Sequence, residues 1–195
     1  MNTTMSFEVP DIVGERLILR HLSPQTLRDA LAQRFAEAAA ALGAALPAAW
    51  QEEAAILALR LQDMESDPAY APWSLRAIIL RDSGEVAGHL NFHSQPGHPY
   101  LQAWGEVELG YTVLPAFRRQ GIAREAVRLA ARWAHEEAGV RRFVLSIAPD
   151  NLPSQALAAR LGFRKVHQVS DPDDGPEDVL IADWPFPEGP VAGRE

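Results

Sequence analysis

The segment 108-ELGYTVLPAFRRQGIAREAVRLAARWA-134 constrains the fold most, because it passes from a strand pattern to a helix pattern through a short basic loop. Apolar residues in its second half recur every three or four positions, which predicts an amphipathic helix. Gly121 stands at the helix entry, where a residue without a side chain lets the backbone approach a ligand closely. The first N–H groups of a helix lack internal partners, so this loop is suited to an anion such as phosphate. The alternative is an ordinary tight turn with solvated arginines.

Composition narrows the class of protein. The chain has 195 residues, of which 47% are hydrophobic and 23% are charged, as expected for one compact domain. It has no cysteine, which excludes disulfides, thiolate metal sites and a cysteine nucleophile. The net charge is -8, and the arginines between 118 and 142 form a local cluster rather than the broad basic face of a nucleic-acid-binding protein. No segment resembles a signal peptide or a membrane span, so we expect a soluble, cytoplasmic protein without nucleic-acid or membrane partners.

Periodicity and turn residues predict seven strands and four helices. The strands are expected over 16–22, 73–80, 86–92, 105–113, 142–148, 163–169 and 178–184, and the helices over 24–42, 48–64, 122–134 and 153–161. This order predicts an α/β or α+β fold with a mixed central sheet of about seven strands flanked by about four helices. We expect a single domain over 15–184, an N-terminal extension over 1–14 and a flexible tail over 185–195.

The basic loop resembles motif A of the GNAT superfamily, the acetyl-CoA-dependent N-acetyltransferases. That motif reads [Q/R]-x-x-G-x-[G/A] between a strand and a helix, and Arg118, Gly121 and Ala123 hold its three positions. The predicted order of strands and helices also resembles that fold. The resemblance covers roughly residues 15 to 184, and it implies that one acyl-CoA N-acyltransferase domain uses acetyl-CoA as acyl donor, without a metal.

Two further stretches resemble the branch of this family that acetylates the N-termini of ribosomal proteins. One is the opening 15-ERLILRHLSP-24. The other is 142-RFVLSIAPDNLPSQALAARLGFRKV-166, which matches the pattern N-x-x-S-x(7)-G-F. The residues at the four fixed positions are Asn151, Ser154, Gly162 and Phe163. A homodimer would fit this branch, but nothing in the sequence fixes one.

The resemblance implies which residues bind the coenzyme. Backbone N–H groups of the loop would bind the pyrophosphate, and Asn151 would hydrogen-bond the coenzyme unless it is only a turn residue. An N–H group at Val113, or at the adjacent Leu114, would polarise the thioester carbonyl. The complete set of expected coenzyme-binding residues is Val113, Leu114, Arg118, Arg119, Gln120, Gly121, Ile122, Ala123, Arg124 and Asn151.

Acetyl transfer to an amine also needs a base and a proton donor for the leaving thiolate. Glu108 is the expected base, because related enzymes often carry a carboxylate on the strand before the coenzyme loop. Glu106 lies two residues away and is not firmly separated from it, and either residue could instead be an exposed strand residue. Many family members use a tyrosine as the donor, but Ala158 holds that position here. The branch resemblance implies Ser154 instead, with a helix cap as its alternative role.

The acceptor is less constrained than the coenzyme site. A protein α-amino group has a pKa of about 7.7–8.0, whereas a lysine or polyamine amine has one near about 10.4 and needs more help from its base. A site with one glutamate therefore favours an α-amino group of a protein or peptide. A small amine, such as a polyamine or aminoglycoside, and a non-catalytic acyl-CoA-binding regulatory module remain alternatives. The net charge of -8 would attract any of these cations.

Three histidines raise the alternative of a metal site. His89 and His93 lie four residues apart in a predicted strand, and His98 follows in the next loop. Strand spacing places the first two on one face but too far apart to share a metal easily. We therefore expect no metal.

Overall fold

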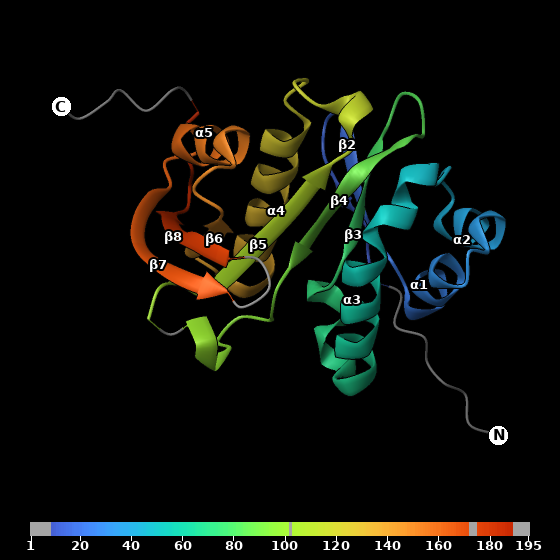
Figure 1. Cartoon of the computed structure of the whole chain (residues 1–195), viewed down its shortest axis with the longest axis horizontal. Coiled ribbons are helices and arrows are strands. Elements are labelled where there is room, and N and C mark those ends of the chain that lie inside the picture. Colours follow the sequence, from blue (N-terminus) through green and yellow to red (C-terminus); the bar gives the residue numbers. More distant parts are fainter. Residues whose placement is uncertain (1–8, 102, 172–174, 189–195) are drawn as a thin grey trace.

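The protein forms one mixed sheet in the computed structural model, which describes residues 9–101, 103–171 and 175–188. The strand order is β1-β2-β3-β4-β5-β6-β8-β7 (Figure 1). The strands are β1 (Ile12–Val13), β2 (Leu17–His21), β3 (Arg76–Leu80), β4 (Val86–Phe92), β5 (Val107–Val113), β6 (Arg142–Ile147), β7 (Arg164–Asp171) and β8 (Gly175–Asp183). Only β5 and β6 pair in parallel, and all other neighbours are antiparallel.

Helices cover both faces of this sheet, with α1, α2 and α3 on one side and α4 on the other (Figure 1). The α-helices are α1 (Pro24–Leu31), α2 (Phe35–Leu42), α3 (Ala54–Ser66), α4 (Ile122–Ala138) and α5 (Leu152–Arg160). Short 3-10 turns are η1 (Ala48–Glu53), η2 (Pro68–Trp73), η3 (Pro99–Leu101) and η4 (Pro115–Phe117). The predicted mixed fold is confirmed. The described ranges hold eight strands rather than seven because the short β1 was not predicted.

Two predicted helices are divided. The expected helix over 24–42 breaks between α1 and α2, where Gln33 adopts a positive φ of 59°. The expected helix over 48–64 begins as the 3-10 turn η1 and becomes α-helical only from Ala54. The break lets α1 pack against both α2 and α3 on the same face of the sheet.

The predicted domain limits of 15 and 184 are too narrow. Ile12 is buried and pairs with Leu19, so the sheet begins inside the expected N-terminal extension. At the other end, Phe186 is buried and its ring packs against the rings of Phe143 and Phe163. The part of the expected tail that is described, up to residue 188, therefore belongs to the folded unit. Residues 1–8 and 189–195 of the two predicted end segments lie outside the described residues.

The sheet opens between its two parallel strands. β5 and β6 pair only through Val107 with Phe143 and Glu108 with Val144. Beyond these pairs β5 continues along β4, and β6 continues along β8, so the two halves diverge (Figure 1). Gly105 permits the close approach at the paired end, because a Cβ there would lie 2.6 Å from Val144 Cγ2.

Helix α4 fixes the loop at the open end. Its apolar face is buried, as the sequence predicts, and Trp133 packs on Phe92 of β4 with ring centroids 5.4 Å apart. Gly121 and Gly139 flank the helix, both with positive φ. Within the described ranges no helix has the length and apolar character needed to span a membrane.

Candidate active site

A hollow of about 290 Å³ lies between β5 and β6, where the sheet has opened. Both strands and the start of α5 contribute to it. Its lining residues are Leu109, Gly110, Tyr111, Leu145, Ser146, Ile147, Ala148, Asn151, Ser154 and Glu177. The sequence predicted Asn151 and Ser154 as site residues, and the structure brings both to this hollow.

The loop that follows β5 presents an open helix terminus. Gly121 has a φ of 77° at the N-cap of α4, and no side chain of the described residues caps this helix. The first N–H groups of α4, at Ile122, Ala123 and Arg124, are therefore available to a ligand. A Cβ at Gly121 would meet no described atom closer than 3.7 Å, so the space above these N–H groups is open. The geometry fits the predicted anion site.

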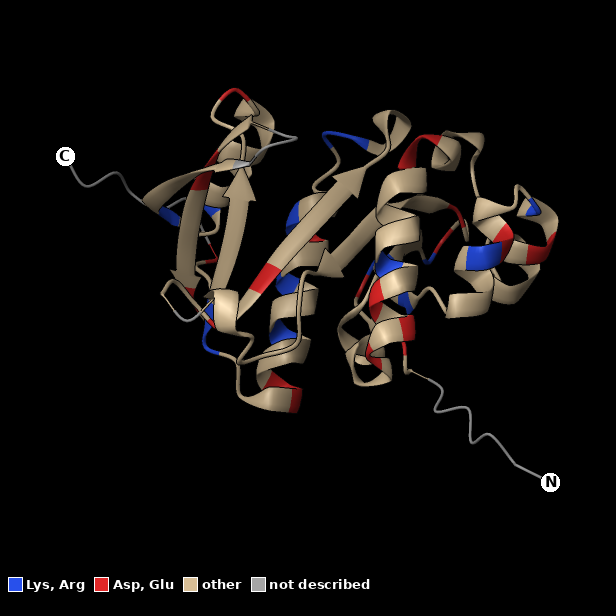
Figure 2. Ribbon diagram, turned by 60° about the horizontal axis from the view of Figure 1, so that its bottom comes forward, with Lys and Arg blue, Asp and Glu red and all other residues tan. Residues whose placement is uncertain are grey.

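The side chains of this loop differ in whether hydrogen bonds hold them in place. Figure 2 shows basic residues at the loop between β5 and α4. Arg118 Nε donates to the carbonyl oxygen of Val113 at 2.8 Å, and Gln120 Nε2 donates to that of Ala116 at 3.4 Å. Arg119 has a positive φ of 63° and is exposed. These side chains shape the loop and leave cationic groups at its rim.

The side chain of Arg124 contacts the C-terminal segment. The sequence predicted it as a coenzyme ligand, but its guanidinium donates to the carbonyl oxygen of Glu188. Arg128, one turn later, donates to the carbonyl oxygens of Pro187 and Phe186. Both arginines hold the C-terminal segment against α4. One terminal nitrogen of Arg124 thus binds the C-terminal segment, and its backbone N–H group lies in the first turn of α4.

Arg16, the residue before β2, contacts this loop in a way that the sequence did not predict. Its Nε donates to Glu125 Oε2 at 2.7 Å, and its backbone N–H donates to Glu125 Oε1. Its two terminal nitrogens lie 3.4 and 3.3 Å from the carbonyl oxygen of Gln120. Arg16 thus offsets a carboxylate in the first turn of α4 that would otherwise repel an anion. The pairing joins residues 109 positions apart, so no local sequence signal reveals it.

Backbone hydrogen bonds distinguish Val113 from Leu114, the two residues whose N–H groups were predicted to polarise the thioester carbonyl. The Leu114 N–H group donates to the Ala87 carbonyl oxygen, so Leu114 is unavailable and that expectation is corrected. The Glu108 carbonyl also faces β4, because it accepts from the His93 N–H group. Peptide groups alternate along a strand, so the N–H group of Val113 points to the opposite edge, toward the opening. Val113 therefore stays as the candidate.

Glu108 is buried at the paired end of the opening, with 5% of its surface exposed. Its Oε2 accepts a hydrogen bond from the Tyr100 hydroxyl at 2.9 Å, and its Oε1 lies 3.5 Å from His93 Nδ1. Burial, and then the Glu108 charge, raise the pKa of Tyr100 above its ordinary value. The exposed-residue alternative is thus wrong for Glu108. The sequence missed both partners, since each lies in or beside a loop.

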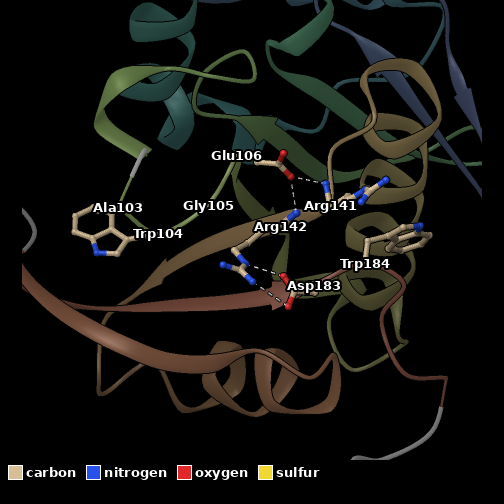
Figure 3. Close-up of a pocket in the computed structure, with 8 residues that line it drawn as sticks. All are labelled: Ala103, Trp104, Gly105, Glu106, Arg141, Arg142, Asp183 and Trp184. Atoms are coloured by element: carbon tan, nitrogen blue, oxygen red, sulfur yellow. Dashed lines mark hydrogen bonds and ion pairs between the residues drawn. The ribbon is translucent and has the colours of Figure 1, made fainter.

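Glu106 has different surroundings from those of Glu108. It precedes β5 and accepts hydrogen bonds from the backbone N–H groups of Arg141 and Arg142 (Figure 3). It borders a second hollow of about 480 Å³, which contains the ion pair between Arg142 and Asp183 (Figure 3). Glu106 is thus held by backbone N–H groups, whereas Glu108 lies buried within β5 next to the residues that line the opening, so the geometry favours Glu108 over Glu106 as the candidate base.

Tyr111 and Ser154 are neighbours at the far wall of the smaller hollow. The Tyr111 hydroxyl is buried and has no hydrogen-bond partner among the described residues. Burial raises the pKa of Tyr111, and the nearby Ser154 hydroxyl lowers it by less. Asn151 Oδ1 accepts from the Ser154 N–H group and so caps α5. Sequence reasoning missed Tyr111, although the strand alternation places it opposite Glu108.

The histidines do not form a metal site. His89 Nε2 lies 2.8 Å from Glu53 Oε2, whereas His93 faces Glu108, so the two rings serve different partners. No group of three metal-binding side chains is found in the part of the chain that the structure describes.

The fold belongs to the class of mixed α/β proteins whose sheet opens between two parallel strands, and the uncapped helix N-terminus beside the opening suits a phosphate-bearing ligand. The chain matches the protein-family model for the acetyltransferase (GNAT) domain over residues 16–164 and belongs to this family. The predicted membership of the GNAT superfamily is thereby confirmed. GNAT acetyltransferases use acetyl-CoA, which carries the pyrophosphate that such a helix terminus suits.

Individual relatives agree with this assignment. The uncharacterized N-acetyltransferase YnaD of Bacillus subtilis is 28% identical over 89 residues, which are 45% of this chain and 48% of that protein. Aminoglycoside N(6')-acetyltransferase type 1 of Salmonella typhimurium is 33% identical over 60 residues, which are 31% of this chain and 41% of that protein. The chain spans about half the length of the first curated relatives it matches.

A solved structure shows the same fold over a longer stretch. Ribosomal-protein-S5-alanine acetyltransferase from Vibrio fischeri superposes with a TM-score of 0.59 and covers 89% of this chain and 96% of its own. Its sequence identity is 14%, so the likeness concerns the fold.

Proposed function

We propose that this protein is an N-acetyltransferase that moves the acetyl group of acetyl-CoA to a primary amine, within one acyl-CoA N-acyltransferase domain. The observation that carries the proposal is the opening between β5 and β6. It contains a hollow lined by Asn151 and Ser154, and β5 leads directly into the open N-terminus of α4. The coenzyme pyrophosphate would bind the N–H groups that follow Gly121, with Arg118 and Arg119 at the rim. Pantetheine would extend between the strands.

The reacting groups fit opposite faces of the sheet. Glu108 and Tyr111 are three residues apart on β5, so their side chains point to opposite faces. The amine nitrogen would attack the thioester carbon from the Glu108 face, with Glu108 as the base of the site. The C–S bond would then break toward the Tyr111 face, where Ser154 would donate a hydrogen bond or a proton to the sulfur. The Val113 N–H group would polarise the carbonyl oxygen.

For the acceptor we propose an α-amino group of a protein or peptide. An α-ammonium group loses its proton near neutral pH, so it needs only the modest base that Glu108 and its neighbours supply. The pattern of Asn151 and Ser154 supports the same choice. A small amine is the second candidate, favoured by the partial identity to an aminoglycoside acetyltransferase.

The test is an initial-rate assay with acetyl-CoA and three acceptors: a peptide with a free N-terminal serine, spermidine and kanamycin. A thiol reagent reports the released coenzyme A without background, because the chain has no cysteine. We expect the peptide to give the highest kcat/KM. A higher value for either small amine would reverse the substrate choice. Binding of acetyl-CoA without turnover of any acceptor would contradict the enzyme and indicate a non-catalytic binding module.

Arg16→Ala should weaken acetyl-CoA binding about threefold to tenfold, because Glu125 then keeps an uncompensated charge beside the pyrophosphate. Calorimetric titration measures the change. If neutralisation is the cause, the double variant Arg16→Ala/Glu125→Gln should regain most of the wild-type affinity. Equal losses in the single and double variants would show that Arg16 acts in another way.

Ser154→Ala should lower kcat about tenfold and leave KM for acetyl-CoA within about twofold, because the lost hydroxyl stabilises only the developing thiolate. Tyr111→Phe removes the neighbouring buried hydroxyl with little change in volume and is the companion variant. A larger loss in Tyr111→Phe than in Ser154→Ala would move the donor role to Tyr111. Unchanged kcat in both variants would remove the donor from this wall of the hollow.

A further inference from the structure

Glu108 does not itself present a free surface to an acceptor. Only 7% of its side-chain surface is exposed, and one carboxylate oxygen is already bonded to the Tyr100 hydroxyl. His93, which faces the other carboxylate oxygen, has 34% of its side chain exposed. His93 follows β4 directly and pairs with Glu108 through its backbone N–H group. Of the two titratable groups, His93 is therefore the one that an incoming amine can reach.

The other nitrogen of the His93 ring lies above β5. A Cβ placed on Gly110 would be only 2.6 Å from His93 Nε2, so this nitrogen occupies the space that a side chain at position 110 would fill. Gly110 also lines the hollow between β5 and β6. His93 Nε2 thus lies beside Gly110, one of the residues that line the hollow, whereas Nδ1 faces Glu108.

We propose that His93 is the catalytic residue that takes the proton from the acceptor amine at Nε2, and that Glu108 is the positioning residue that orients its ring through Nδ1. This inference rests on the proposed acetyltransferase function and divides the role of the base between two side chains. The arrangement also explains why position 110 holds a glycine, since any larger residue would displace the His93 ring.

The proton balance is complete with these groups. In the neutral tautomer that carries its proton on Nδ1, toward Glu108 Oε1 3.5 Å away, His93 has a lone pair on Nε2. The amine nitrogen forms its bond to the thioester carbon, its proton moves to Nε2, and the C–S bond breaks to release thiolate. The resulting imidazolium is stabilised by the Glu108 charge 3.5 Å away. The proton then returns to solvent, and the thiolate is protonated from the opposite face.

Burial outweighs the charged groups around His93 in shifting the pKa of its ring. Burial lowers the pKa of His93 below its ordinary value, and the Glu108 charge raises it by less. Arg60, whose Nη1 lies 3.4 Å from the His93 carbonyl oxygen, lowers the pKa further, and Asp63, paired with Arg60 at 2.7 Å, opposes it. Tyr100 on η3 faces Glu108 as a neutral phenol. A base with a pKa below that of free histidine is unprotonated at neutral pH, as the reaction needs.

The pH dependence of kcat/KM tests the proposal with the N-terminal serine peptide as acceptor. In the wild-type enzyme the logarithm of kcat/KM should fall with slope one below the α-amine pKa of about 8, and with slope two below the pKa of His93. His93→Gln should lower kcat/KM about 100-fold or more and keep slope one down to about pH 5. The control variant His167→Gln replaces an exposed histidine of β7 by the same residue, and its pH profile of kcat/KM should match that of the wild type. A His93→Gln enzyme with more than a third of wild-type activity and slope two would overturn the proposal.

A second measurement needs no turnover. NMR titration of the His93 ring in the resting protein should give a pKa below about 6.5. Glu108→Gln should lower this pKa further, because the carboxylate that raises it is gone. An unchanged His93 pKa in Glu108→Gln would show that the two groups do not interact, and would refute the pairing even in an active enzyme. An inactive wild type in which the pairing is seen would instead refute the proposed function, and the role of His93 with it.

Discussion

Gly121→Trp is expected to weaken acetyl-CoA binding at least about 100-fold, which corresponds to about 2.7 kcal/mol of binding free energy. Gly121 has a φ of 77°, which a residue with a side chain adopts at a cost of about 1–2 kcal/mol. The indole would also stand in the open space beside the first N–H groups of α4, where the pyrophosphate would bind. Calorimetric titration of both proteins with acetyl-CoA measures the loss against an expected micromolar wild-type affinity.

The other end of the same helix provides a matched control. Gly139 has a φ of 68° and open space around a Cβ, so Gly139→Trp imposes similar backbone strain far from the loop. It should bind acetyl-CoA within about twofold of the wild type. Equal losses in both variants would assign the effect to a damaged α4. Wild-type protein that does not bind at millimolar acetyl-CoA would remove the coenzyme site altogether.

Local signals explain why the loop and α4 could be predicted from the sequence. The apolar period of α4 and the glycine at its entry lie within one continuous segment, and the physical reasons for both act over a few residues. The same holds for α5, where Asn151 and the following proline mark the helix start. The division of the helix expected over 24–42 has no such marker, since no glycine or proline stands at Gln33.

Contacts between distant segments explain most of what was missed. Arg16 reaches Glu125 only because the sheet brings β2 beside α4, and Phe186 is buried only because the chain turns back after β8. His93 and Glu108 meet through the register of β4 on β5, which pairs Phe92 with Leu109. The sequence predicted both strands but not their register, and a shift of one residue would have placed the two side chains on opposite faces.

Glu108→Gln is expected to lower kcat about 100-fold or more, because the base of the site then lacks the carboxylate that positions it, with KM for acetyl-CoA nearly unchanged. The amide keeps the shape of the side chain and its contact with Tyr100, but it removes the charge that orients His93 and stabilises the imidazolium. Initial rates with the N-terminal serine peptide at saturating acetyl-CoA measure the effect. Because the coenzyme loop is untouched, calorimetric binding of acetyl-CoA should match the wild type.

Glu106→Gln is the control that decides between the two neighbouring carboxylates. Glu106 accepts from the backbone N–H groups of Arg141 and Arg142 at the paired end of the strands, and its amide would keep part of that contact. We expect kcat within about threefold of the wild type. If Glu106→Gln loses as much activity as Glu108→Gln while both proteins stay folded, the reaction centre cannot be the opening above Glu108. A Glu108→Gln enzyme with wild-type kcat would lead to the same conclusion, because no other buried carboxylate of the described residues borders that opening from β5.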